Sequence, residues 1–238
     1  MKKFDQITEI YSYFFLWPFR MHVDIPTIKS YLNQSETRTI LDYGCGAGFI
    51  SHWLKKEGEK NIVGFDTSPN MLSLARKNAK KYGLDIIYTS SLDNYFETFD
   101  LALAIYIIPY CKNLDEVRSV VQSIYRVLKP NGRLILLTIN PDFSTDSEYY
   151  RSYGFRLIEK QPRKDGSSIY FNICMPPYNE IIQAYYYSDS TLGKVILQTG
   201  FNYLQYGNMI ADHPETIEPF FNYLQCPHAQ LITAVKIA

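Results

Sequence analysis

The most constraining feature of the chain is an apolar stretch that leads directly into glycines at alternating positions. Residues 39–43 (TILDY) have the composition of a β-strand, Gly44, Gly46 and Gly48 follow, and residues 50–57 resemble a helix. Glycine lets the backbone turn sharply and lets a ligand approach without a Cβ in the way. A helix that begins there presents free N–H groups and a positive dipole end. The pattern predicts a turn that holds an anionic ligand, the alternative being a tight turn with no ligand.

A second apolar strand favours the ligand. Residues 61–66 (NIVGFD) end in Asp66, which lies 18 positions after Gly48. A carboxylate at the tip of the second strand can accept hydrogen bonds from both hydroxyls of a ribose. The glycine spacing differs from the Gly-x-Gly-x-x-Gly of dinucleotide enzymes. The alternative for Asp66 is a solvated loop carboxylate.

Together these elements resemble the class I S-adenosylmethionine (SAM) methyltransferases, in which Asp-x-Gly-x-Gly-x-Gly surrounds the methionine part of SAM. Asp42, Gly44, Gly46 and Gly48 match that pattern position by position, and Asp66 matches the ribose acid. The resemblance implies SAM as the cofactor. It also implies an α/β fold: a Rossmann-like, seven-stranded, mostly parallel sheet with N-terminal lid helices and a small antiparallel insertion after strand five.

The chain has 238 residues, the length of one α/β domain with additions. We expect a single SAM-binding domain over 1–238, with lid helices at 1–35, a core at 36–140, an inserted antiparallel cap at 142–190, and a closing helix and strands at 191–238. Hydrophobic periodicity predicts a first helix that Pro18 ends and a second helix that Asp24 caps. The expected inserted strands are 155–160, 168–175 and 181–187.

Composition argues against several classes of partner. Lys plus Arg and Asp plus Glu balance at 24 each, which gives no electrostatic reason to expect nucleic acid or an anionic membrane. The four cysteines are isolated and lack zinc-site spacing, so we expect a reducing compartment and no metal. No signal peptide and no run of 18 apolar residues is visible, which predicts a cytoplasmic protein.

The resemblance implies further cofactor-binding residues. Arg20 would hold the SAM carboxylate through its planar fork, unless it is a surface arginine at a helix junction. Met71 would face the adenine, unless it packs within its helix. The family often has an acid against the adenine amino group, and this chain has Ser91 or Asp93 there. The other expected contacts are Tyr11, Thr67, Leu92, Ala104 and Tyr110.

Three residues are predicted to be catalytic. Tyr106 and Asn140 directly follow central strands, whose carboxyl ends are where open α/β sheets bind ligands. Tyr178 lies in the Tyr-rich insertion (142–190). We expect this insertion to cover the acceptor site together with the leader, by which we mean the lid helices at 1–35. Aromatic faces stabilise a sulfonium, and an amide can orient the reacting group. The histidines (His22, His52, His213 and His228) are scattered, and none follows a predicted core strand.

The predicted function is SAM-dependent methyl transfer to nitrogen or oxygen of a small, flat or apolar molecule in specialised metabolism. The Trp17-Pro18-x-Arg20 leader, Asn140-Pro141 and a late Gly200-Phe201 resemble the toxoflavin-biosynthesis N-methyltransferase group. Three alternatives stay open: cyclisation of SAM to azetidine-2-carboxylate and methylthioadenosine, methylation of protein or tRNA, and SAM binding without catalysis. The acceptor and the oligomeric state are not determined by the sequence.

Overall fold

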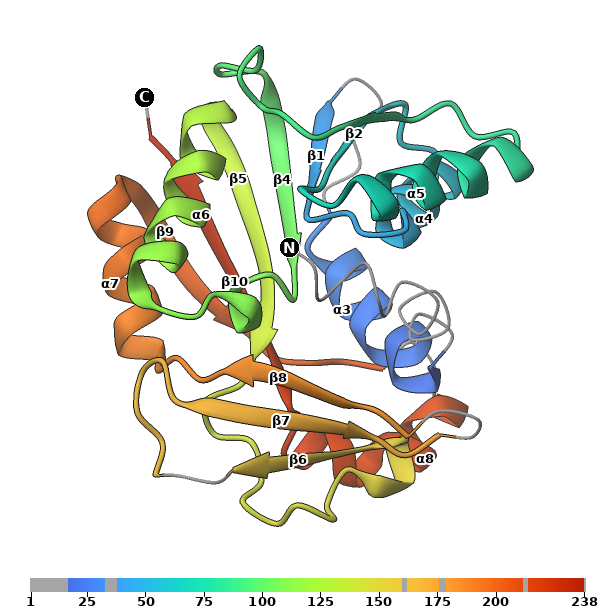
Figure 1. The fold of residues 1–238 in the computed structure, drawn as a ribbon, viewed down its shortest axis with the longest axis vertical. Coiled ribbons are helices and arrows are strands. Elements are labelled where there is room, and N and C mark those ends of the chain that lie inside the picture. The colour runs from blue at the N-terminus through green and yellow to red at the C-terminus, as the bar shows by residue number, and fades with distance from the viewer. Residues whose placement is uncertain (1–16, 33–37, 160–161, 176–178, 212–213, 238) are drawn as a thin grey trace.

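The computed structural model describes residues 17–32, 38–159, 162–175, 179–211 and 214–237 (Figure 1). Its main sheet has seven strands in the order β3-β2-β1-β4-β5-β10-β9. The strands are β1 (Thr39–Tyr43), β2 (Asn61–Phe65), β3 (Ile87–Thr89), β4 (Phe99–Ile105), β5 (Leu128–Ile139), β9 (Phe201–Gly207) and β10 (Ala229–Lys236). Strand β1 pairs in parallel with β2 and β4, so the strand order reverses at β1. Ligands of open α/β sheets bind at such a switch point, outside the carboxyl ends of the strands.

Strand β10 is antiparallel to both of its neighbours, β5 and β9. The other pairings within the sheet are parallel, so the predicted mostly parallel, seven-stranded fold is confirmed. The direction of β10 has a consequence for the site. Because it runs against β5, the residues that precede β10 lie at the edge where β1, β4 and β5 end.

Helices cover both faces of this sheet. They are α4 (Phe49–Lys56), α5 (Pro69–Lys81), α6 (Leu114–Val127) and α7 (Asp189–Thr199), and a further helix, α8 (Pro214–Gln225), precedes β10. Side chains of a strand alternate between faces, and in β1 Ile40 packs with Leu54 of α4 whereas Leu41 packs with Val117 of α6. The sheet is therefore buried on both sides, as parallel sheets are.

The leader is helical from Pro18 without a break at Asp24. A π-helical segment (Arg20–Asp24) continues directly into α3 (Ile25–Ser30), and Asp24 has helical dihedral angles and no side-chain cap. The predicted helix start at Asp24 agrees with the start of α3, but the predicted capping by the Asp24 side chain was wrong. Pro26 has no N–H to donate within the helix, and a π-turn is one way in which a helix accommodates a disrupted ladder. The first predicted helix, before Trp17, lies outside the described residues.

The insertion forms a separate antiparallel sheet in the order β6-β7-β8. Its strands are β6 (Phe155–Glu159), β7 (Ser168–Ile173) and β8 (Ile181–Tyr185), which confirms three predicted strands with shorter bounds. Short 3₁₀ helices at Ile108–Tyr110 and Arg151–Tyr153 complete the described elements. In Figure 1 the tips of β4 and β5 point toward this sheet.

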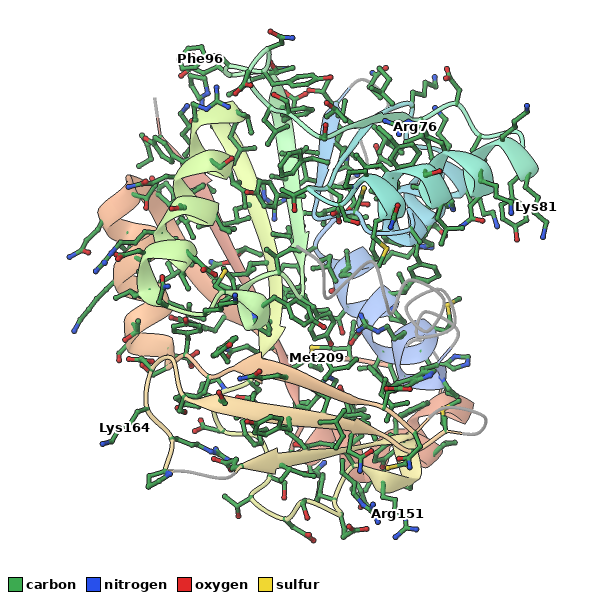
Figure 2. The ribbon with its side chains drawn as sticks, viewed as in Figure 1. Arg76, Lys81, Phe96, Arg151, Lys164 and Met209 are labelled. Carbon is green, nitrogen blue, oxygen red and sulfur yellow. The ribbon has the colours of Figure 1, made fainter. Side chains whose placement is uncertain are left out.

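Two further observations concern the molecule as a whole. Charged side chains such as Lys81, Arg151 and Lys164 lie at the periphery, whereas Met209 is buried between the two sheets (Figure 2). Within the described ranges, no helix is long and apolar enough to cross a membrane.

Candidate active site

The turn after β1 requires glycine at three positions for two different reasons. Gly44, Gly46 and Gly48 have positive φ angles of 76°, 52° and 88°. A Cβ on Gly44 would lie 1.9 Å from Cδ1 of Ile107, whereas a Cβ on Gly46 would meet no atom of the described residues within 4 Å. Gly44 therefore permits packing of the protein itself, and the space beside Gly46 is open. That open space fits the expected close approach of a ligand to the backbone.

Asp66 lies beside the same glycine. Its Oδ2 accepts a hydrogen bond from the N–H of Gly46 at 2.9 Å, and its Oδ1 accepts one from the N–H of Ser68 at 2.8 Å. The carboxylate is half-buried at the end of β2. The structure thus brings together the predicted glycine turn and the predicted ribose acid, and their donor and acceptor groups fit a nucleoside with a charged tail.

Asp42, two residues before Gly44, helps to hold this turn in place. It is 2% exposed, and its Oδ2 accepts a hydrogen bond from Oγ of Ser51 at 2.5 Å, which joins β1 to α4. Burial raises the pKa of Asp42 to about 6. These contacts give Asp42 a positioning function, and its predicted contact with the cofactor stays a prediction.

Four expected cofactor residues, of which Met71 and Ser91 were expected at the adenine, lie at the ends of β2 and β3 and in α5. Thr67 and Ser91 are exposed, whereas Met71 and Leu92 are buried. The carbonyl of Leu92 accepts a hydrogen bond from Arg126 at 2.8 Å. All four lie on the β2–β3 side of the glycine turn, and their contact with a cofactor stays a prediction.

Three other expected cofactor residues lie elsewhere. Ala104 is fully buried within β4, and Tyr110 is half-buried against the core. Tyr11 is outside the described residues, as is Tyr178, which was predicted to be catalytic.

Tyr106 belongs to a buried polar cluster at the end of β4. It has a φ angle of 56°, and its hydroxyl donates to Oδ2 of Asp24 at 3.0 Å. The guanidinium of Arg20 lies 4.3 Å from the centre of the Tyr106 ring, and its Nη1 lies 3.5 Å from Oδ2 of Asp24. Burial raises the pKa of Asp24 to about 7, against the opposing effects of Arg20 and the Tyr106 hydrogen bond. The leader and the end of β4 therefore form one charged cluster.

His228 extends this cluster from the other side. Its ring stacks on that of Tyr106 with centroids 5.9 Å apart, and its Nε2 lies 3.5 Å from the Tyr106 hydroxyl. Its Nδ1 lies 2.6 Å from the hydroxyl of Tyr223. Burial holds the pKa of His228 well below its usual value, so the ring is neutral near pH 7. The sequence analysis missed His228 because this residue precedes a strand and does not follow one. The available signal was the antiparallel direction of the final strand, which brings the residue just before β10 to the ligand-binding edge.

Asn140 has hydrogen bonds to the chain at both ends of its amide. Nδ2 donates to the carbonyl of Pro227 at 2.9 Å, and Oδ1 accepts from the N–H of Asp142 at 3.0 Å. The backbone N–H of Asn140 donates to the carbonyl of His228 at 2.9 Å. Asn140 therefore connects the end of β5 to the two residues that precede β10, and its predicted catalytic function stays a prediction.

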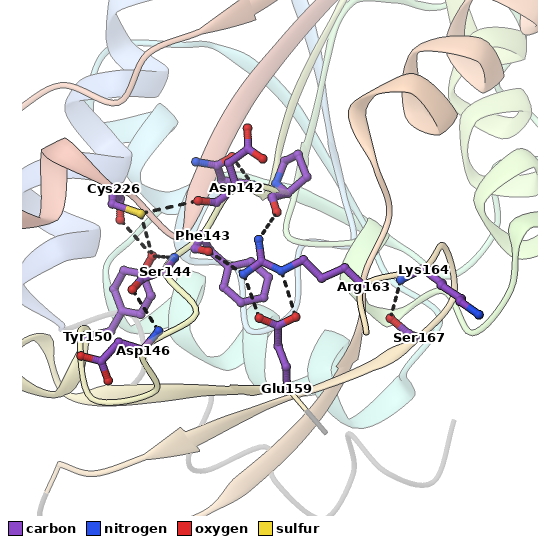
Figure 3. Close-up of polar contacts among 12 residues, drawn as sticks. Asp142, Phe143, Ser144, Asp146, Tyr150, Glu159, Arg163, Lys164, Ser167 and Cys226 are labelled. Atoms are coloured by element: carbon purple, nitrogen blue, oxygen red, sulfur yellow. Dashed lines mark hydrogen bonds and ion pairs between the residues drawn. The ribbon is translucent and has the colours of Figure 1, made fainter. Parts of the chain in front are cut away.

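The segment after Asn140 is held by Arg163 and Tyr150 (Figure 3). Arg163 donates to the carbonyls of Pro141 and Phe143, each at 2.6 Å, and pairs with Glu159 of β6. The hydroxyl of Tyr150 donates to the carbonyl of Cys226 at 2.9 Å. These bonds fix the inserted sheet to the edge of the main sheet.

An aromatic cluster joins the leader, the insertion and the closing strand. The ring of Phe19 lies 5.4 Å from that of Phe155 in β6 and 5.2 Å from that of His228. Phe155 and His228 are themselves 4.8 Å apart. The two additions to the minimal fold therefore pack together at the carboxyl edge, where the glycine turn also lies.

A glycine turn after β1 and an acid after β2, at the switch point of a doubly wound sheet, define a nucleotide-binding α/β protein. Residues 34–188 match the family model described as a methyltransferase domain, and this match covers more than half of the chain. The chain therefore belongs to the methyltransferase domain family, and its fold is that of the class I SAM-dependent methyltransferases.

Individual relatives agree with this assignment. The chain is 28% identical over 189 residues to a ubiquinone/menaquinone biosynthesis C-methyltransferase of Neisseria meningitidis, covering 72% of this chain and 70% of the relative. It is 30% identical over 133 residues to a ubiquinone biosynthesis O-methyltransferase of Actinobacillus pleuropneumoniae, covering 50% of this chain and 55% of the relative. The chain thus spans about half the length of some curated relatives that it matches.

A solved structure shows the same fold. The SAM-dependent methyltransferase of Mesorhizobium loti superposes with a TM-score of 0.59 at 19% identity, covering 88% of this chain and 96% of that one. The predicted class and fold are confirmed, and SAM is the cofactor of this class. The toxoflavin-related subgroup stays a prediction.

Proposed function

We propose that this protein transfers the methyl group of SAM to a nitrogen or oxygen atom of a small, flat or apolar molecule. The observation that carries the proposal is the open space beside Gly46, with the Asp66 carboxylate 2.9 Å from the N–H of that glycine. Bound SAM supplies a methyl group on a positively charged sulfur whose leaving group is a neutral thioether.

The residues of the chain would act by holding and orienting the reactants. Gly46 and Asp66 would bind the methionine and ribose parts, and Met71, Thr67, Ser91 and Leu92 would surround the adenine. Positioning alone supplies a large part of the rate enhancement when a strong electrophile and a nucleophile are held in line.

The acceptor would lie among aromatic side chains at the end of β4. Tyr106 and the cluster of Phe19, Phe155 and His228 are buried and pack against one another at this position. Such surroundings favour a positively charged sulfur and a flat acceptor. The O- and C-methyltransferases of quinone biosynthesis among the relatives support a small-molecule acceptor.

We further propose that residues 1–35 and 142–190 cover the acceptor site, with Tyr11 and Tyr178 contributing to it and Asn140 orienting the acceptor. The contacts of Phe19 with Phe155 support this arrangement, because they join the leader to the insertion. A cytoplasmic function in specialised metabolism, within the toxoflavin-related subgroup, completes the proposal.

Mass spectrometry of the protein incubated with SAM, alone and with a panel of aromatic amines and phenols, tests this function. S-adenosylhomocysteine that forms only with an added acceptor supports methyl transfer. Methylthioadenosine formed from SAM alone would instead indicate cyclisation to azetidine-2-carboxylate. SAM binding in calorimetry without either product, over an acceptor panel extended to protein and tRNA, would indicate a non-catalytic binding protein.

A further inference from the structure

Asp24 has one carboxylate oxygen that its surroundings do not satisfy. The residue is 2% exposed, and its Oδ2 lies 3.0 Å from the Tyr106 hydroxyl and 3.5 Å from Nη1 of Arg20. Its Oδ1 is buried and has no hydrogen-bond donor within the part of the chain that the structure describes. Buried carboxylate oxygens normally have donors, so an unsatisfied one indicates that a donor arrives with a ligand.

Arg20 and Asp24 together present opposite charges on neighbouring turns of the leader. Both side chains are buried, with 7% and 3% of their surfaces exposed, and they come from residues four positions apart. A buried cation beside a buried anion with a free acceptor matches a ligand that carries both charges close together. The head group of an α-amino acid, with its ammonium and carboxylate on one carbon, has this property.

The position of the pair relative to the glycine turn points to the same ligand. The Arg20 guanidinium lies against Tyr106, and the next residue, Ile107, occupies the space beside Gly44. The pair therefore borders the first glycine of the turn on the β4 side. Asp66 lies at the end of β2, on the other side of β1. A ligand whose ribose is held at Asp66 would direct its amino acid tail across β1 toward Arg20 and Asp24.

We propose that Asp24 binds the α-ammonium group of SAM and of S-adenosylhomocysteine through Oδ1, while Arg20 binds their carboxylate. The inference rests on the proposed function, since it assumes that the glycine turn binds these ligands. It adds Asp24 to the cofactor site and makes the π-helical segment of the leader a clamp for a zwitterion.

The clamp makes ligand affinity depend on pH. Arg20 on the same segment, Tyr106 after β4 and Tyr223 of α8 surround Asp24, and His228 before β10 contacts both tyrosines; only the arginine among these four carries a charge near pH 7. Burial raises the pKa of Asp24 to about 7, so the carboxyl is largely protonated at pH 6. Binding of an ammonium group requires the ionised form. S-adenosylhomocysteine should therefore release close to one proton on binding at about pH 6, and almost none at about pH 8.

Calorimetry with three ligands tests the clamp. S-adenosylhomocysteine has both charged groups, its decarboxylated analogue keeps only the ammonium, and methylthioadenosine has neither. Asp24→Asn should weaken binding of the first two by about 10- to 100-fold and change methylthioadenosine affinity by less than about 3-fold. Arg20→Gln should weaken S-adenosylhomocysteine alone. Asp115→Asn is the matched control, because the side chain of Asp115 is 88% exposed on α6.

The opposite results of these experiments would contradict either the clamp or the proposed function. An unchanged affinity of Asp24→Asn for S-adenosylhomocysteine, or an equal loss for all three ligands, would show that Asp24 has no contact with the ammonium group. If Asp24→Asn fails to fold, the wild type decides the question. Equal proton release with S-adenosylhomocysteine and methylthioadenosine at about pH 6 would contradict the proposal. Wild-type protein that binds none of the three ligands would instead refute the proposed function itself.

Discussion

At the scale of single residues, Gly46 differs from the other two glycines of the turn. Gly44 and Gly48 face protein atoms: a Cβ on Gly48 would lie 2.5 Å from the Tyr88 hydroxyl. Gly46 faces space that none of the described residues fills, so a side chain there would displace a ligand and not this part of the protein. Its positive φ adds backbone strain to any substitution.

Gly46→Val should abolish SAM binding, because its methyl groups would fill the space beside the backbone where the ligand lies. Gly83→Val is the matched control: Gly83 also has positive φ, at 64°, and no atom in the described part of the chain lies within 4 Å of a Cβ added there. Both variants should lose about 1–2 kcal/mol of stability through backbone strain. Calorimetry with SAM measures binding, and circular dichroism verifies the fold. SAM affinity that stays unchanged in Gly46→Val would remove the central assignment of the site.

Kinetics can show whether Asn140 acts in methyl transfer or in cofactor binding. Asn140→Ala removes the hydrogen bonds to Pro227 and Asp142, which hold the chain next to His228. We expect turnover to fall by about 10-fold or more while SAM affinity changes by less than about 3-fold, since the ligand contacts of the glycine turn are intact. Steady-state kinetics and calorimetry give the two numbers. Equal losses would make Asn140 a cofactor ligand, and no loss of either would place the chemistry elsewhere.

At the scale of elements, Arg163 makes several of the contacts that hold the inserted sheet. Arg163 donates to two carbonyls of the segment after β5, pairs with Glu159, and lies 3.9 Å from the centre of the Phe143 ring. This side chain therefore joins β6 to the edge of the main sheet (Figure 3).

Arg163→Gln should lower the free energy of unfolding by about 1–3 kcal/mol, because several charge-assisted hydrogen bonds are lost at a partly buried site. Arg151→Gln serves as the control. Its ion pair with Glu148 is surface-exposed, so its loss should cost less than about 1 kcal/mol. Urea denaturation followed by circular dichroism measures both. Equal effects of the two substitutions would show that Arg163 does not hold the insertion.

At the scale of the whole molecule, the buried cluster should make stability depend on pH. The pKa of Asp24 is raised from 3.8 to about 7, so the folded protein holds a proton that the unfolded chain releases near pH 4. This contribution to stability is fully present below about pH 4 and is lost as the pH rises to about 7, by at most about 1.4 kcal/mol per pH unit. His228 acts in the opposite direction, because its lowered pKa makes the folded state lose stability as the pH falls below about 6.5.

The comparison of Asp24→Asn with wild type isolates the first contribution. At pH 5 both side chains are neutral, whereas at pH 8 only the wild type has a buried carboxylate. The stability of the variant relative to wild type should therefore increase by about 2 kcal/mol between pH 5 and pH 8. Thermal denaturation at the two pH values measures this change, and Asp115→Asn should show none. A difference that does not vary with pH would mean that Asp24 titrates normally. A gain in stability with a loss of ligand affinity is typical of residues kept for function.

The sequence by itself determined the local parts of this protein. Alternating glycines after an apolar strand, and an acid at the end of the next strand, predicted the turn and the position of Asp66. These signals are readable because positive φ angles and short apolar runs are properties of a few consecutive residues. The predicted cap at Asp24 was wrong because a capping residue before proline is a local signal, whereas in the folded leader Asp24 is already in a helical turn.

Only the tertiary structure decided which side chains share the buried cluster. The hydroxyl of Tyr106 meets Asp24 across 82 positions of sequence and His228 across 122. No local pattern encodes these contacts, because they depend on the leader folding over the end of β4 and on β10 running antiparallel to β5. The pKa values of Asp24 and His228 follow from the same burial. Amino-acid composition determines neither pKa value, because desolvation depends on which residues the folded chain places around the ionisable group.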